Sequence, residues 1–240
     1  MKIKLRLVSI LKFLCALIIF WFLFLLISYI GRNNSGDIAL ILFGGVMIQK
    51  DETAPDIISI LRWNIIEFIP VLVTLMGFDF ECGRKSLTFL RSRSVWRWYF
   101  DKILVIILFH YAYIAVGLLA EMLVYSDRTM LHNILILMPL HALSVALCCL
   151  TAHIAWGHMR LAIAVYFLIN GVTAAMGIMD NALNKFAYSY FGMVNRSSYV
   201  NEQFGFNTKI AVFTMILVIL INISAQAIYL KKERLATINF

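Results

Sequence analysis

Three ionisable side chains interrupt long apolar stretches of the sequence, where such groups are costly. Glu67 lies near the middle of the apolar run 57–78, and His110 and His141 lie within two later runs. An uncompensated carboxylate at the middle of a bilayer costs at least about 2.5 kcal/mol, so Glu67 must be protonated, paired or hydrated. Arg62 is five residues away, about 140° around a helix, which is a poor position for an ion pair. His110 and His141 are therefore the candidate partners.

These three polar residues have two interpretations, one functional and one structural. Glu67, His110 and His141 could line a substrate pathway, or they could form a structural hydrogen bond between helices. Familiar catalytic motifs do not decide between them, because the five histidines form no H-E-x-x-H pair and the sequence has no G-x-S-x-G elbow. Residues 77–86, GFDFECGRKS, only approach a phosphate-binding loop. We therefore expect no catalysis by this chain alone, no bound cofactor or metal, and no ATP hydrolysis.

The elements that carry these residues are predicted to be membrane-spanning helices. The 240-residue chain is 62% hydrophobic and 14% charged, too apolar for a water-soluble globule. Its apolar runs lack the period-2 alternation of a transmembrane barrel. We predict an all-α, polytopic membrane protein with a single transmembrane domain, residues 1–240. Its six spans are about 13–30, 57–78, 103–125, 134–156, 161–179 and 210–230.

Charge sets the expected orientation in the cell membrane. Fourteen Lys and Arg residues flank the spans on one side and six on the other, which places both termini in the cytoplasm. Residues 2–12 show an amphipathic pattern typical of an interfacial helix, although flanking charge alone is an equal alternative. The net charge of +8 is explained by these flanks and by anionic lipid, so nucleic acid is not an expected partner.

Two further segments have a distinctive composition. The predicted outer loop 180–209 carries seven aromatic residues, which suggests that it rests in the outer interface or caps an exit. The fifth span carries Asn170 and small residues, including Gly171 and Ala175 at a small-x-x-x-small spacing. That spacing favours close helix packing, either within one chain or between two.

The segment 79–102 is the longest polar, strongly basic stretch between two spans. It contains Glu81-Cys82-Gly83-Arg84, then Leu90-Arg91-Ser92-Arg93-Ser94, and it ends at Lys102. This order, with six spans in about 240 residues, resembles the membrane subunits of type-2 ABC exporters. A solvated loop that only sets the topology is the plain alternative.

The resemblance implies a permease that pairs with a second permease, identical or related, and binds separate ATPase subunits, which hold the ATP. It also implies that a helix near Arg84 to Leu90 couples the ATPase to the spans, and that Gly171 and Ala175 lie near the permease interface. The coupling residues would be Glu81, Gly83, Arg84, Lys85, Leu87, Leu90, Arg91 and Arg93. The small size of the loops suggests that the exported substrate is a peptide or another amphipathic antimicrobial. An integral membrane enzyme using Glu67 and the histidines, and a non-transporting assembly subunit, remain as alternatives.

Overall fold

The described part of the chain is a bundle of long helices. A computed structural model describes residues 21, 43, 45–46, 57–82, 95–124, 130–176, 185–200, 202 and 205–238. Its long helices are α3 (Ile57–Cys82), α5 (Val95–Val124), α6 (Leu131–Trp156), α7 (Met159–Met176) and α8 (Thr208–Ile238). Two short 3₁₀ helices, η2 (Tyr188–Tyr190) and η3 (Val194–Arg196), lie between α7 and α8. The prediction of an all-α fold is confirmed for the described residues, since they contain no strand.

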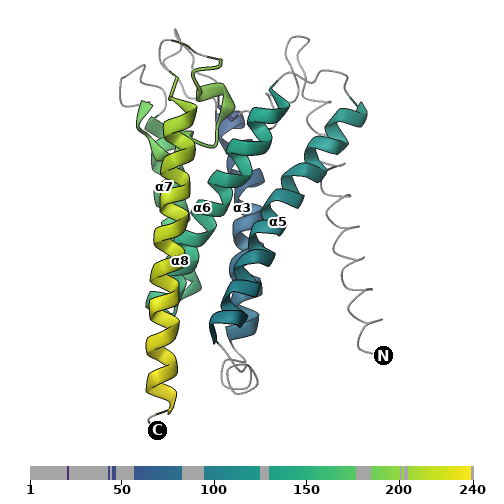
Figure 1. Cartoon of the computed structure of the whole chain (residues 1–240). Helices are drawn as coiled ribbons and strands as arrows, with labels where there is room; N and C mark the ends of the chain where they lie inside the picture. The colour runs from purple at the N-terminus through teal and green to yellow at the C-terminus, as the bar shows by residue number, and fades with distance from the viewer. Residues whose placement is uncertain are drawn as a thin grey trace.

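Helix α6 is the centre of the bundle. It packs against α3, α5, α7 and α8, as Figure 1 shows. Its sequence is apolar all around and has no polar face that must meet water, and the neighbouring helices bury most of its residues. Gly157, with φ 72°, ends α6 in a left-handed cap in which its N–H donates to His153 O over 2.8 Å.

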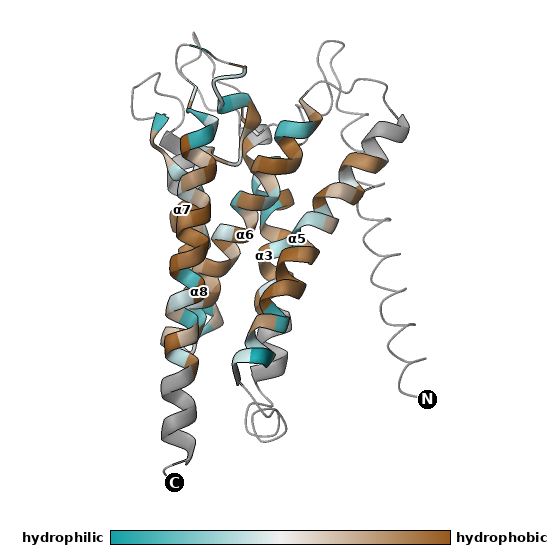
Figure 2. Cartoon of the chain, viewed as in Figure 1, coloured by the Kyte–Doolittle hydropathy of each residue, from teal (hydrophilic) through white to brown (hydrophobic). Residues whose placement is uncertain are grey.

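The outer surfaces of the surrounding helices are apolar. Large side chains such as Leu61 on α3, Leu108 on α5, Leu168 on α7 and Phe213 on α8 are exposed. Figure 2 shows hydrophobic residues along the middle of these helices and more hydrophilic ones toward their ends. An exposed apolar belt of this extent is typical of a surface that faces lipid.

Four of the described helices are long and apolar enough to cross a membrane. The qualifying stretches are Ile60–Gly77, Trp96–Leu119, Leu131–Trp156 and Thr208–Leu230. They correspond to the predicted second, third, fourth and sixth spans. In the predicted fifth span, the apolar stretch found is Met159–Asn170, which is shorter than a full span. The first span, 13–30, lies outside the described residues except for Trp21, which is helical.

Two helices on either side of the basic segment extend beyond the predicted spans. Helix α5 begins at Val95 rather than at 103, and α3 continues to Cys82. Residues 95–102, assigned from the sequence to the cytoplasmic segment 79–102, are therefore the first turns of α5. The reason is that no proline or glycine interrupts the chain between Val95 and Phe109, so the helix extends through Trp96-Arg97-Trp98-Tyr99. The amphipathic helix 2–12 lies outside the described residues.

The ends of the helices alternate along the bundle. The end of α3, the start of α5 and the C-terminal end of α8 lie at the same end of the molecule (Figure 1). We call this the inner end, after the charge-based orientation, and the opposite end the outer end. Trp21 packs against α5 nearer the outer end, where its indole N–H donates to Tyr113 O over 3.1 Å. A Cβ added at Gly117 would lie 2.7 Å from the Trp21 ring, so only glycine leaves room for this contact.

Candidate functional site

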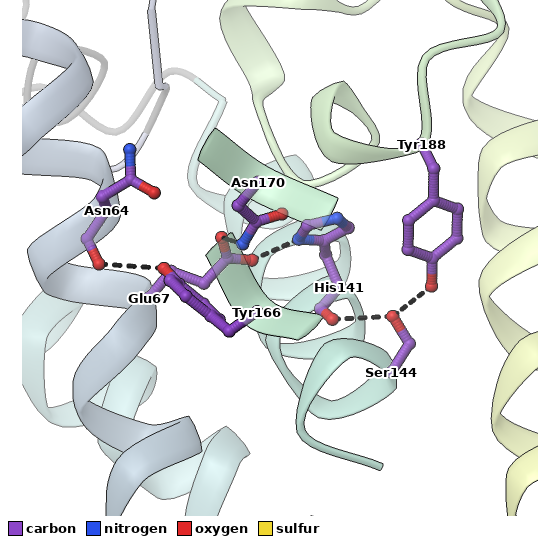
Figure 3. A network of polar contacts seen from close by, with 7 residues as sticks. All are labelled: Asn64, Glu67, His141, Ser144, Tyr166, Asn170 and Tyr188. Atoms are coloured by element: carbon purple, nitrogen blue, oxygen red, sulfur yellow. Dashed lines mark hydrogen bonds and ion pairs between the residues drawn. The ribbon is translucent and has the colours of Figure 1, made fainter. Parts of the chain in front are cut away.

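The central polar site begins with Glu67 on α3. Its side chain is fully buried, although it lies near the middle of the apolar stretch Ile60–Gly77. Two side chains from other helices approach its two carboxylate oxygens. His141 Nδ1 on α6 bonds to Oε1, and the Asn170 amide on α7 donates to Oε2 over 2.6 Å. Figure 3 shows the three groups converging. We call Glu67, His141 and Asn170 the polar triad.

The contact between Glu67 and His141 requires one proton between the two atoms. The amide that donates to the second oxygen favours a carboxylate, with His141 Nδ1–H as the donor. His141 Nε2 is buried and has no hydrogen-bond partner in the described part of the chain. A neutral ring avoids leaving an N–H unpaired there, which is the more costly arrangement. The triad can thus exchange or hold a proton, or hold three helices together.

Further hydrogen bonds fix the helices around the triad. Tyr166, one turn before Asn170 on α7, donates from its hydroxyl to Asn64 O on α3 over 3.0 Å. Ser144 Oγ donates to His141 O over 2.7 Å, and Tyr188 bonds to the same Ser144 hydroxyl (Figure 3). Burial raises the pKa of the Tyr188 hydroxyl, so it stays protonated and donates.

Both helices that carry the Glu67–His141 contact contain an internal proline within one turn of it. Pro70 follows Glu67 on α3, and Pro139 precedes His141 on α6. Each proline removes the backbone hydrogen bond to the carbonyl four residues earlier. The Thr74 hydroxyl donates to Pro70 O over 2.9 Å, one turn after the Ile66 carbonyl that Pro70 leaves without its helix hydrogen bond.

A folded segment covers the outer end of the triad. Residues 185–200, which we call the outer cap, pack onto the bundle, and Tyr190 and Phe191 are buried in it. A Cβ added at Gly192 would lie 2.9 Å from Cβ, Cγ and Nδ1 of His141. The cap backbone therefore rests directly on the imidazole. The predicted outer loop is partly this cap, although its residues Phe186 and Tyr199 are exposed.

The cap is fixed to a second segment near the outer end. Asn195 donates to Gly45 O over 3.1 Å, and Arg196 Nε donates to Val46 O over 2.7 Å. The Arg196 guanidinium also lies 4.9 Å from the centre of the Tyr190 ring. Because Arg196 is buried, these contacts compensate part of the cost of removing its charge from water.

A second polar cluster joins α5, α6 and α8 toward the inner end. The buried Tyr99 hydroxyl at the start of α5 donates to Gln226 Oε1 over 2.9 Å, and Gln226 Nε2 lies 3.0 Å from both Thr151 Oγ1 and Leu147 O. Thr151 Oγ1 lies 2.6 Å from Asn222 Oδ1. We call Tyr99, Thr151, Asn222 and Gln226 the inner cluster.

The predicted site residues are only partly brought together. His141 contacts Glu67, as one of the two suggested pairings requires, whereas His110 bonds through Nδ1 to Ile106 O on its own helix over 2.9 Å. Glu81 lies in α3, but its side chain is not described, and the same holds for Gly171 and Ala175 in α7. The remaining coupling residues, Gly83, Arg84, Lys85, Leu87, Leu90, Arg91 and Arg93, lie outside the described residues.

The sequence analysis did not predict that Asn170 bonds to Glu67, or that Tyr166 and Ser144 form hydrogen bonds next to the triad. A signal was present for α7, since Tyr166 and Asn170 are polar, four residues apart and thus on one helical face.

Among the described residues, no group of three or more His, Cys, Asp or Glu side chains could hold a metal ion. Comparison of the chain with protein-family models, curated proteins and solved structures finds no match.

Proposed function

We propose that this chain is the permease subunit of an ABC exporter in the cell membrane, driven by separate ATPase subunits and paired with a second permease. The observation that supports the proposal most is the anchoring of α5. This helix begins at Val95, within the basic segment 79–102, and its residue Tyr99 is bound to α8 and, through Gln226, to α6. The basic segment is thereby joined to the core of the bundle rather than to a peripheral helix.

This arrangement suits the transmission of motion. Helices α3 and α5 contain the two ends of the basic segment 79–102, and they pack against each other and against α6. A partner that moves the segment would shift the two helices together, and the inner cluster would carry the shift to α6 and α8. Helix α6 also carries His141, so the same movement would reach the polar triad and the outer cap. Under this proposal the triad lies on or beside the substrate route.

The substrate class is the least constrained part of the proposal. The small size of the loops predicted from the sequence favours an amphipathic substrate, such as a peptide antimicrobial, taken from the membrane. The covered state of His141 under Gly192 fits a route that is closed at its outer end in this conformation.

The experiment begins with the proteins that co-purify with the tagged full-length chain. We expect an ATPase subunit whose hydrolysis is stimulated when both are reconstituted. Charge reversal at Arg91 and Arg93, or Glu81→Gln, should weaken ATPase binding and leave membrane insertion intact. Tyr99→Phe should instead preserve binding and reduce the stimulation, because it breaks only the hydrogen bonds from α5 to Gln226 and Ile223 O on α8.

A matched control is available on α8. Tyr229 is three residues from Gln226 but is 43% exposed, so Tyr229→Phe should leave the stimulation unchanged. The proposal fails if no ATPase binds, or if the Arg91, Arg93 and Glu81 variants all retain normal binding and transport. The basic segment would then only set the topology.

An integral membrane enzyme is the second candidate, and the buried contact between Glu67 and His141 favours it. A carboxylate bonded to an imidazole is an arrangement that general acid–base catalysis uses. This candidate predicts that the purified chain turns over a membrane-soluble substrate without ATP or a partner, and that Glu67→Gln removes the activity. A non-transporting assembly subunit predicts neither this activity nor stimulation of an ATPase.

A further inference from the structure

A cavity lies between α3 and α5, apart from the polar triad and the inner cluster. Its volume is about 250 Å³, larger than the roughly 150 Å³ apolar cavity that holds a benzene molecule in another protein. Its lining residues are Val73, Thr74, Gly77, Lys102, Val105, Ile106 and Phe109. None of them belongs to the triad, so the cavity is a separate feature of the bundle.

The walls of the cavity are suited to an apolar occupant. The only hydroxyl among the lining side chains, that of Thr74, already donates to Pro70 O on its own helix. Gly77 leaves space, since a Cβ added there would meet no atom within 4 Å. A polar, water-soluble ligand would lose its hydration here without gaining equivalent hydrogen bonds.

The cavity opens to the outside of the described bundle. Val73, Gly77 and Val105 line it and are also exposed. Val73 and Gly77 lie within the membrane-length stretch of α3, and Val105 lies within that of α5. The surroundings of the opening are therefore acyl chains rather than water.

A lysine lines the inner end of the cavity. Lys102 lines the cavity and is half-buried, so its aliphatic stem covers apolar surface while its ammonium group can reach the interface. An ammonium group has three N–H donors and can bind a phosphate while keeping another contact. Arg97, which is exposed, lies closer to the helix end. An apolar cavity beside a cation matches a molecule with an acyl tail and an anionic head.

We propose that this cavity binds one acyl chain of an anionic phospholipid from the leaflet at the inner end, with the lipid phosphate against Lys102. The orientation expected from Lys and Arg places this end at the cytoplasmic leaflet, which contains the anionic lipids. The inference is independent of the exporter function, because it uses only α3, α5 and their position in a bilayer.

The test uses the full chain in vesicles of phosphatidylglycerol and phosphatidylcholine. In separate preparations, one or the other lipid carries a photoactivatable diazirine on its acyl chain, and adducts are mapped by mass spectrometry. We expect phosphatidylglycerol adducts concentrated at residues 73–77 and 102–109, about fivefold above phosphatidylcholine, the preference that one lysine gives near a membrane surface. Lys102→Gln should remove this preference.

Variants that fill the cavity provide the second readout. Gly77→Phe should abolish the adducts at these residues, and Val105→Trp at the opening serves if Gly77→Phe does not fold. Leu108→Phe is the control, because Leu108 is 60% exposed on α5 and does not line the cavity. Adducts spread evenly over the exposed apolar faces, including Leu217 and Leu220 on α8, would overturn the proposal. Equal capture of the two lipids, or cross-linking of α3 to a second copy of the chain in place of lipid, would also overturn it.

Discussion

Glu67 and His141 are 74 positions apart in the sequence, and their side chains bond to each other inside the bundle with both residues fully buried. Asn170 adds a third helix to the contact. Glu67, whose carboxylate is the most costly group to bury in the apolar spans, is thus the residue that joins α3, α6 and α7.

Substitution of Glu67 separates a structural role from a functional one. Glu67→Gln keeps one oxygen to accept from His141 Nδ1–H, and its amide N–H can donate to Asn170 Oδ1 once that amide flips, so stability should change by less than about 1 kcal/mol. Glu67→Leu leaves both partners unpaired and should cost about 2 kcal/mol. Thermal unfolding and transport are measured on both variants. If the triad lies on the substrate route, Gln alters transport in a stable protein. Normal transport with a stable Leu variant would contradict both roles.

The two histidines should differ in their importance. His141→Leu removes a partner of a buried carboxylate and should lower stability by about 2 to 3 kcal/mol. His110→Leu should cost less than about 1 kcal/mol, because Ile106 O keeps its backbone hydrogen bond within α5. Melting temperatures of the two purified variants provide the comparison. Equal losses at both positions would show that the contact with Glu67 contributes nothing particular.

Gly192 should not tolerate a side chain. In Gly192→Ala the new methyl group would lie 2.9 Å from the His141 ring, so the cap or the imidazole must move, at a cost of about 1 to 3 kcal/mol. Gly77→Ala is the matched control, since its methyl group meets nothing and helix propensity favours alanine by about 0.5 to 1 kcal/mol. Hydrogen exchange across residues 185–200 reports the cap. Unchanged protection in Gly192→Ala would mean that the cap does not rest on His141 in the membrane.

The predicted orientation can be tested by labelling single cysteines with an impermeant thiol reagent, in a background without the four native cysteines. Ser92→Cys should react only from the cytoplasmic side, and Tyr199→Cys, which replaces a side chain that is 54% exposed, only from the other side. Ser197→Cys is the control, because Ser197 is fully buried and should stay unreactive while the cap is folded. Reversed labelling of Ser92 and Tyr199 would overturn the orientation and the coupling proposal.

The sequence predicted the elements better than the contacts. Runs of apolar residues located α3, α6 and α8, because a membrane span depends on composition over a window, although α3 and α8 continue past the predicted ends at 78 and 230. The start of α5 was placed eight residues late, since Trp96 to Lys102 look like a polar loop by charge although nothing in them stops a helix. Glu67 was identified as a candidate site residue only because a carboxylate is costly to place in the middle of a bilayer. Its pairing with His141 rather than His110 depends on which helices are neighbours, and an apolar pattern without a clear polar face carries no information about that.

Pro70 and Pro139 allow the polar triad to control the bending of α3 and α6. A helix bends most easily where a backbone hydrogen bond is missing, and both helices have their weakest point within one turn of the same contact. The bond between Glu67 and His141 links α3 and α6 next to these two prolines. While the bond is intact, bending of one helix at its proline would displace the other helix. A proton or substrate that breaks the bond would let both helices bend independently, so that the halves of α3 and α6 on either side of the triad could rotate separately.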